Sequence, residues 1–213
     1  MASCKSVDTP LSASSKLELM PGTLYSDPTR YRQIVGTLQY LTFTRPDICY
    51  AVNKVCQFMH APTEDHWSTV KRILCYLQAT ITYGLHITRD SLLSLHGFTD
   101  ADWADSINNH KSTSGYIVYL SSTSISWKFR KQRIVARSST ETEYKVLAVN
   151  PVFHTRTKHV EVNYHFVHDR VTKWEIQVRF ISSKDQLVDV LTKPLSPVPF
   201  AYFWSKLRVE SPP

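Results

Sequence analysis

The sequence is poor in glycine, in cysteine and in uninterrupted apolar stretches. Its five glycines in 213 residues form no phosphate-cradling cluster, so a nucleotide site built on a glycine-rich loop is not expected. No stretch free of Asp, Glu, Lys and Arg reaches the roughly 18 residues of a membrane-spanning helix, which argues against a membrane protein. The N-terminal start has no apolar core, so we expect an intracellular protein that is not secreted; the compartment stays open.

The four cysteines show no paired spacing of the kind that binds metal. Cys4, Cys49, Cys56 and Cys75 are therefore expected to be free thiols in a reducing compartment. The formal net charge of +7 favours an acidic partner such as nucleic acid. The length allows one or two domains with a substantial core.

Residues 27–80 show the period of helices. Asp27 before Pro28 is a typical N-cap and first helical position. Apolar residues then recur three or four apart in three stretches, which are interrupted at residues 44–46 and 61–63. This pattern predicts a small module of three helices.

The middle of the chain changes to the period of strands. Residues 93–100, 115–120 and 125–129 alternate or are rich in β-branched and aromatic residues, and a serine-rich turn separates the last two. We expect a three-stranded antiparallel meander. Beyond it we expect a helix at 141–148, a strand at 176–181, a short helix at 185–191 and a loosely held, proline-rich tail.

Three carboxylates fall where this order of elements could bring them together. Asp100 ends the first strand, Glu143 lies in the following helix and Asp189 lies in the last helix. Such a group would suit Mg²⁺, which prefers oxygen ligands. Carboxylates at the ends of elements are more often solvated caps, so the residues alone leave both interpretations open.

Many short motifs follow one another in one order along the chain. They include FTDADWA at 98–104, RSSTETEY at 137–144 and DQLVDVLTKPL at 185–195, together with residues 111–116, 126–127, 131–132, 150–154, 156–159 and 165–167. Together they resemble the RNase H domain of copia-type LTR retrotransposon Pol polyproteins. Residues 31–41, TRPDI at 44–48, 76–77 and 83–85 resemble the segment that joins the reverse transcriptase to that domain.

The resemblance implies catalytic and metal-binding roles for the three carboxylates. Asp100 matches the family's first catalytic aspartate, Glu143 its glutamate and Asp189 its last aspartate. In the family these residues bind two Mg²⁺ ions, and an activated water cleaves the RNA strand of an RNA–DNA hybrid. The implied partner is such a hybrid or other nucleic acid; no small-molecule substrate is evident.

One catalytic element of the family is missing. Between the glutamate helix and the match at Asn150, the family has a central strand that carries a further aspartate. Here residues 146–149 run straight into Asn150, so we expect a deletion near 148–150 and the loss of that metal ligand. Other acids lack the strand context to replace it; they are Asp102, Asp105, Glu161 and Asp169. A Tyr-x-Asp-Asp polymerase motif is also absent, so polymerisation is not expected.

A basic cluster begins within the last strand of the meander and continues beyond it. Five basic residues lie within ten positions, next to Trp127 and Phe129: Lys128, Arg130, Lys131, Arg133 and Arg137. They are either a nucleic-acid-binding patch or an ordinary solvated hairpin edge, on which lysines discourage edge pairing. The sequence leaves both interpretations open.

These features predict an α/β chain with a mixed sheet. An arm (1–26) precedes a helical connection segment (27–90), an RNase H-like domain lacking one central strand (91–195) and a tail (196–213). We expect a fragment of a copia-type polyprotein with little or no ribonuclease H activity. The alternatives are a non-catalytic nucleic-acid-binding remnant and an unstable pseudogene product.

Overall fold

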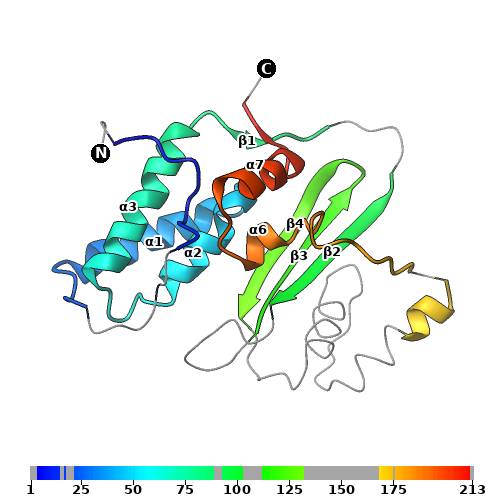
Figure 1. Cartoon of the computed structure of the whole chain (residues 1–213), viewed down its shortest axis with the longest axis horizontal. Helices are drawn as coiled ribbons and strands as arrows, with labels where there is room; N and C mark the ends of the chain where they lie inside the picture. Colours follow the sequence, from blue (N-terminus) through cyan, green and yellow to red (C-terminus); the bar gives the residue numbers. More distant parts are fainter. Residues whose placement is uncertain are drawn as a thin grey trace. The chain divides into compact units, whose positions relative to one another are not determined.

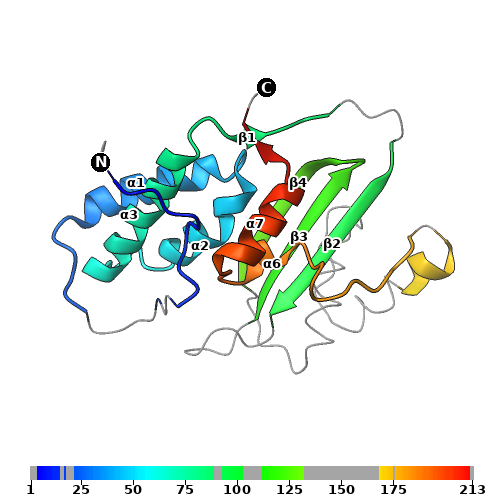
Figure 2. The same cartoon turned by 45° about the horizontal axis from the view of Figure 1, so that its top comes forward.

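The computed structural model describes residues 4–14, 17, 22–88, 93–102, 112–131, 168–174 and 176–211. The chain divides into two compact units, the first made of Met1–Thr88 with Lys193–Pro213 and the second of Arg89–Thr192. Each unit is described by itself below, with its elements labelled in Figures 1 and 2. The predicted helix at 141–148, which carries Glu143, lies outside the described residues. Among the described helices, none has the length and apolarity needed to cross a membrane.

The predicted three-helix module is confirmed in the first unit. It consists of α1 (Pro28–Leu41), α2 (Cys49–Cys56) and α3 (Glu64–Ala79), with the 3₁₀ turn η1 (Pro46–Ile48) leading into α2. The Asp27 side chain accepts a hydrogen bond from the Arg30 backbone N–H at 2.9 Å, as an N-cap should. The proline-containing interruptions at residues 44–46 and 61–63 therefore separate the three helices, as the sequence predicts.

The core of this module comes from the apolar stripes of its three helices. The least exposed side chains, at 0 or 1% each, include Tyr31, Val35, Ile48, Val52, Val55, Val70 and Ile73. The Tyr31 hydroxyl donates a hydrogen bond to the Val55 carbonyl oxygen at 2.8 Å, which satisfies a polar group that would otherwise be costly to bury.

The C-terminal residues complete the first unit. Helix α7 (Pro197–Lys206) buries Phe200 and Phe203, and strand β5 (Val209–Glu210) pairs antiparallel with β1 (Gly84–Leu85). Phe200 also makes an edge contact with Tyr76 of α3, at a ring separation of 5.9 Å. The expectation of a loosely held tail is therefore wrong, because Phe200 and Phe203 lie three residues apart on one face of α7 and are buried in the core of the first unit.

The second unit contains the predicted three-stranded meander. Strands β2 (Leu95–Asp102), β3 (Thr113–Leu120) and β4 (Thr123–Lys131) pair antiparallel in the order β2–β3–β4. The turn between β3 and β4 is short, and Ser121 adopts a positive φ of 55° there. A register shift at Val118/Tyr119 marks a β-bulge next to this turn.

The region after residue 168 differs from the prediction in two respects. The short terminal helix exists as α6 (Asp189–Thr192), starting four residues later than the predicted 185. The strand predicted at 176–181 is absent: these residues are described and belong to no strand. Alternation of apolar and polar residues gives a segment one apolar and one polar face, but a strand also needs hydrogen bonds to the backbone of a neighbouring strand. None of the described strands pairs with this segment. The supported fold class is thus a mixed α/β chain with a small antiparallel sheet.

Candidate functional site

The candidate site begins with Asp100 in the second half of β2. Pairing across the sheet sets Asp100 opposite Gly115 of β3, and Gly115 opposite Phe129 of β4. Residues paired in this way share one face of a sheet, and alternate residues lie on the other. Asp100 is half-buried, so its carboxylate lies at the boundary between solvent and the packed face.

Helix α6 packs directly on this face of the sheet (Figures 1 and 2). The approach depends on Gly115, because a Cβ there would lie 2.9 Å from Val188 Cγ1 and 3.1 Å from Thr192 Cγ2. Val188 and Thr192 are both fully buried. A glycine inside a strand often marks such a close approach, so this contact has a sequence signal.

Two hydrogen bonds fasten the α6 region to β2. The Thr192 hydroxyl donates to Asp100 Oδ2 at 2.7 Å, and Gln186 Nε2 donates to the Thr99 carbonyl oxygen at 3.0 Å. Asp189 is the first residue of α6 and is half-buried. The structure therefore places Asp189 on the helix that packs against the strand of Asp100, although the two residues are 89 positions apart in the sequence.

The described acids do not make up the expected metal-ligand set. Glu143, Asp105 and Glu161 lie outside the described residues, whereas Asp102 ends β2 and Asp169 lies in a helical turn at 168–172. Within the part of the chain that the structure describes, no group of three or more His, Cys, Asp or Glu side chains could hold a metal ion. One oxygen of Asp100 is also engaged by Thr192. A two-Mg²⁺ centre needs several carboxylate oxygens, and Asp100 and Asp189 are the members of the predicted set that lie among the described residues, so the metal site stays a prediction.

The basic cluster divides between the two faces of the sheet. Lys128 and Arg130 are exposed on β4, opposite Tyr116 and Ser114 of β3. Lys131 is half-buried and shares the face of Asp100, because it is one residue out of phase with the other two. Arg133 and Arg137 lie outside the described residues. The two exposed cations and the Asp100 carboxylate are thus on opposite faces.

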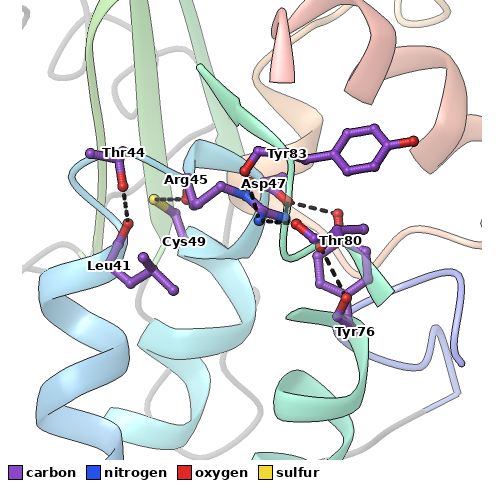
Figure 3. Close-up of polar contacts among 8 residues, drawn as sticks. All are labelled: Leu41, Thr44, Arg45, Asp47, Cys49, Tyr76, Thr80 and Tyr83. Atoms are coloured by element: carbon purple, nitrogen blue, oxygen red, sulfur yellow. Dashed lines mark hydrogen bonds and ion pairs between the residues drawn. The ribbon is translucent and has the colours of Figure 1, made fainter. Parts of the chain in front are cut away.

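The first unit holds a buried polar cluster built on the TRPDI motif (Figure 3). Arg45 is 4% exposed and Asp47 1% exposed. Arg45 donates two parallel hydrogen bonds to the Asp47 carboxylate, from Nε to Oδ1 at 2.9 Å and from Nη2 to Oδ2 at 2.7 Å. The Tyr76 hydroxyl donates to Asp47 Oδ2 at 2.6 Å. Arg45 also donates to the Thr80 hydroxyl at 2.8 Å and to the Thr80 carbonyl oxygen at 3.1 Å.

The electrostatics of this cluster indicate a structural role. Burial opposes the charge of Arg45, but the hydrogen bond and the attraction of Asp47 outweigh it and raise the pKa of the guanidinium. Burial and the Asp47 carboxylate raise the pKa of Tyr76 well above its usual range. Every charge in the cluster is paired, so it joins η1 to the end of α3 rather than forming a reactive site. The sequence singles out both TRPDI and Tyr76 as family motifs, but it does not predict that Tyr76 and Thr80 contact this motif, since neither is near it in the chain.

Comparison with known proteins identifies relatives in transposable elements. The chain is 43% identical to the retrovirus-related Pol polyprotein from transposon RE2 of Arabidopsis thaliana, over 100% of this chain and 17% of the relative. It is 33% identical to the Pol polyprotein from transposon TNT 1-94 of Nicotiana tabacum, over 91% of this chain and 18% of the relative. It is also 48% identical to an uncharacterized mitochondrial protein of Arabidopsis thaliana, over 70% of this chain and 62% of the relative.

The lengths of these matches show how much of each relative the chain represents. The chain spans about a sixth of the polyproteins it matches. The alignment with the transposon RE2 polyprotein runs over 250 positions, 37 more than the 213 residues of the chain. The relative therefore carries residues inside the aligned region that this chain lacks. No family model and no solved structure matches the chain. Matches to Pol polyproteins that cover 91–100% of this chain, with the motifs in family order, show that the chain belongs to the Pol polyproteins of copia-type retrotransposons, as an internally deleted part of one.

Proposed function

We propose that residues 91–195 are a degenerate RNase H-like domain that retains little or no ribonuclease H activity. The observation that carries this proposal is the packing of α6 on β2 and β3. It puts a helix with Asp189 against a strand with Asp100, and a Thr192–Asp100 hydrogen bond of 2.7 Å fixes the contact. That is the relation expected for the first and last aspartates of the family. The helical module of 27–90 would be the connection segment that precedes this domain in longer polyproteins.

The proposed loss of activity has a chemical basis. Cleavage of a phosphodiester by two Mg²⁺ ions needs carboxylates held to within about 0.5 Å of their working positions. The strand with the further aspartate is missing from the sequence, and the excess of 37 aligned positions in the transposon RE2 polyprotein supports a deletion within the chain. The described acids around Asp100 form no three-residue group that could compensate.

A cleavage assay tests this proposal. The purified chain is incubated with Mg²⁺ and a labelled RNA–DNA hybrid, alongside an active ribonuclease H. We expect no cleavage above the buffer blank. Cleavage that Asp100→Asn and Glu143→Gln both abolish, and that Asp185→Asn leaves intact, would overturn it. Asp185 is exposed and outside the proposed ligand set, so its variant controls for a contaminating nuclease.

A second candidate function is nucleic-acid binding without catalysis. It would use the basic cluster of Lys128, Arg130, Lys131, Arg133 and Arg137, of which Lys128 and Arg130 are exposed on the face opposite Asp100. A filter-binding titration against salt measures the number of phosphate contacts, since each contributes a slope of roughly 0.7–0.9 in log–log form. A slope that falls by about two in the double variant Lys128→Gln/Arg130→Gln, but not in Asp100→Asn, favours this function.

The third candidate is a pseudogene product that never folds stably. Cooperative unfolding by urea or heat would contradict it. The transcript sequence around residues 148–150 offers a separate check on all three candidates. An exon that restores the aspartate strand there would remove the basis for inactivity.

A further inference from the structure

The N-terminal residues 4–11 lie along α3 and are fastened to it at several points. Arg72 of α3 donates through Nη2 to the Thr9 hydroxyl at 2.9 Å and through Nε to the Thr9 carbonyl oxygen at 3.2 Å. Thr9 is 2% exposed and Leu11 is 5% exposed, so this segment is part of the folded unit. These anchors hold the beginning of the chain against the helix, and they fix where Cys4 lies.

Cys4 lies beside the last turn of α3. Its Sγ donates to Gln78 Oε1 at 2.8 Å. Cys75 is three residues before Gln78, and residues three apart in a helix share one face. Interaction with the Cys4 thiol is the first cause that raises the pKa of Cys75, which agrees with a position of the two side chains close to each other. Two thiols that are 71 positions apart in the sequence are thus neighbours in the fold.

The accessibility of Cys49 and the pKa of Cys56 distinguish these two cysteines from Cys4 and Cys75. Cys4 and Cys75 are half-buried, so a small reagent in solution can reach them, whereas Cys49 is buried at 5% exposure. Cys56 is also half-buried, but burial raises the pKa of its thiol to about 11. All four are free thiols in the structure.

We propose that Cys4 and Cys75 form a reversible disulfide when the chain meets a small-molecule disulfide such as glutathione disulfide. The Cys4 thiolate attacks one sulfur of the oxidant, which forms a mixed disulfide and releases one glutathione thiolate. The Cys75 thiolate then attacks the Cys4 sulfur, closes the protein disulfide and releases the second glutathione. Two electrons pass from the protein thiols to the oxidant, and the two thiol protons end on the glutathione products.

The order of attack follows from the raised pKa of Cys75. Interaction with Cys4 is the first cause of that shift, so Cys75 is the poorer first nucleophile. Cys75 instead acts as the resolving thiol, because attack on the mixed disulfide occurs within one folded unit. The product would bind the N-terminal segment covalently to α3 and close a loop of about 70 residues. Such a loop restricts the unfolded chain and raises the melting temperature.

The test uses the whole chain and glutathione redox buffers. After oxidation and blocking of the remaining thiols, peptide mapping by mass spectrometry should show one cross-linked pair, Cys4–Cys75, and two blocked cysteines. We expect the oxidised protein to melt higher by roughly 5–10 °C and to return to the reduced value with dithiothreitol. Cys4→Ser should abolish both the cross-link and the shift, while the matched variant Cys56→Ser should retain both.

Two outcomes would overturn the proposal. One is separate glutathione adducts on Cys4 and Cys75 without a cross-link, which would mean that the two sulfur atoms cannot reach bonding distance. The other is an equal yield of Cys4–Cys75 and Cys4–Cys56 products. Oxidation in denaturing urea provides the reference, because selectivity for Cys75 should disappear when the fold is lost.

Discussion

The Thr192 hydroxyl donates a 2.7 Å hydrogen bond to Asp100 Oδ2, which joins the helix α6 to the strand β2. Thr192 is fully buried, and the bond ends on a half-buried carboxylate. Thr192→Val keeps the shape and removes the donor, so we expect the free energy of unfolding to fall by about 1–3 kcal/mol. Urea unfolding measures the change. The control is Thr37→Val, since the exposed Thr37 hydroxyl bonds only within its own helix; an equal loss there would contradict the assignment.

Substitution of glycine by alanine should have opposite effects on stability at Gly115 and at Gly36. A Cβ at Gly115 would lie 2.9 Å from Val188 Cγ1, so Gly115→Ala should destabilise the chain by about 1–3 kcal/mol. Gly36 lies within α1, and apart from its chain neighbours and the backbone of its own helix no atom lies within 4 Å of its Cβ position. Gly36→Ala should therefore stabilise by about 0.5–1 kcal/mol. Thermal or urea unfolding of both variants decides; effects of the same sign would be inconsistent with α6 packing on β3.

The buried Arg45–Asp47 pair should be sensitive to removal of one partner. Asp47→Ala leaves the Arg45 guanidinium buried and uncompensated, and we expect a loss of about 3–5 kcal/mol. The control is Glu210, a half-buried residue whose carboxylate is 3.5 Å from Arg208 and 3.2 Å from His86 in partly solvated pairs, since Glu210→Ala should cost less than about 1 kcal/mol. Urea unfolding measures the free energy of unfolding of both variants. Similar losses would show that burial of the Arg45–Asp47 pair does not determine the cost of removing one partner.

Stability should fall at alkaline pH because of two buried tyrosines. Burial is the first cause that raises the pKa values of Tyr31 and Tyr76 above the ordinary range near 10. Above pH 10 the unfolded chain releases these protons and the folded chain keeps them, so unfolding is favoured as the pH rises. Each tyrosine contributes a slope of about 1.4 kcal/mol per pH unit until its folded pKa is reached.

Single tyrosine variants separate these contributions. Urea unfolding between pH 9 and 11.5 measures how steeply the free energy of unfolding falls with pH. Tyr76→Phe should reduce this slope by the contribution of one tyrosine. Tyr40 is 79% exposed, so Tyr40→Phe should leave the slope unchanged. An unchanged slope in both Tyr76→Phe and Tyr31→Phe would show that other groups cause the alkaline loss.

The extended segment 176–181 should promote self-association. It belongs to no strand and exposes Phe180 at 95% and Val178 at 56%. Exposed alternating apolar residues without a partner strand are a recognised aggregation hazard. Phe180→Lys should therefore lower light scattering at high concentration with little change in the free energy of unfolding. The control is Ile87→Lys, at a residue 73% exposed outside the segment. An equal effect of both variants would point to net charge instead.

Local sequence signals account for what could be predicted of the fold. The Asp27–Pro28 cap and the proline breaks define the helices, and alternation with a serine turn defines the meander; both are confirmed. Features that depend on distant partners were missed. Tyr76 meets Asp47 from 29 residues away, and the C-terminal helix joins a core made by residues before 88. The strand predicted at 176–181 failed for the same reason, since alternation says nothing about whether a neighbouring strand exists.

The candidate site was predicted from motifs rather than from periodicity. The family order of motifs singled out Asp100 and Asp189, and the structure places them on packed elements. Their catalytic and metal-binding roles, like those of Glu143 and the basic cluster, stay predictions. The glycine opposite Asp100 was the one local clue to the packing of α6, because a strand interior rarely includes a residue without a side chain.

The pairing of β1 with β5 has a consequence for biosynthesis. A ribosome makes residues 1–88 first, then the entire second unit, and only afterwards the residues of α7 and β5. The first unit is therefore complete only after residues 193–213 have been made. A stop codon near residue 193 would spare all of the second unit and still leave the first unit with an open apolar surface. A nonsense mutation at that position should thus impair the helical module, although that module is synthesised before the second unit.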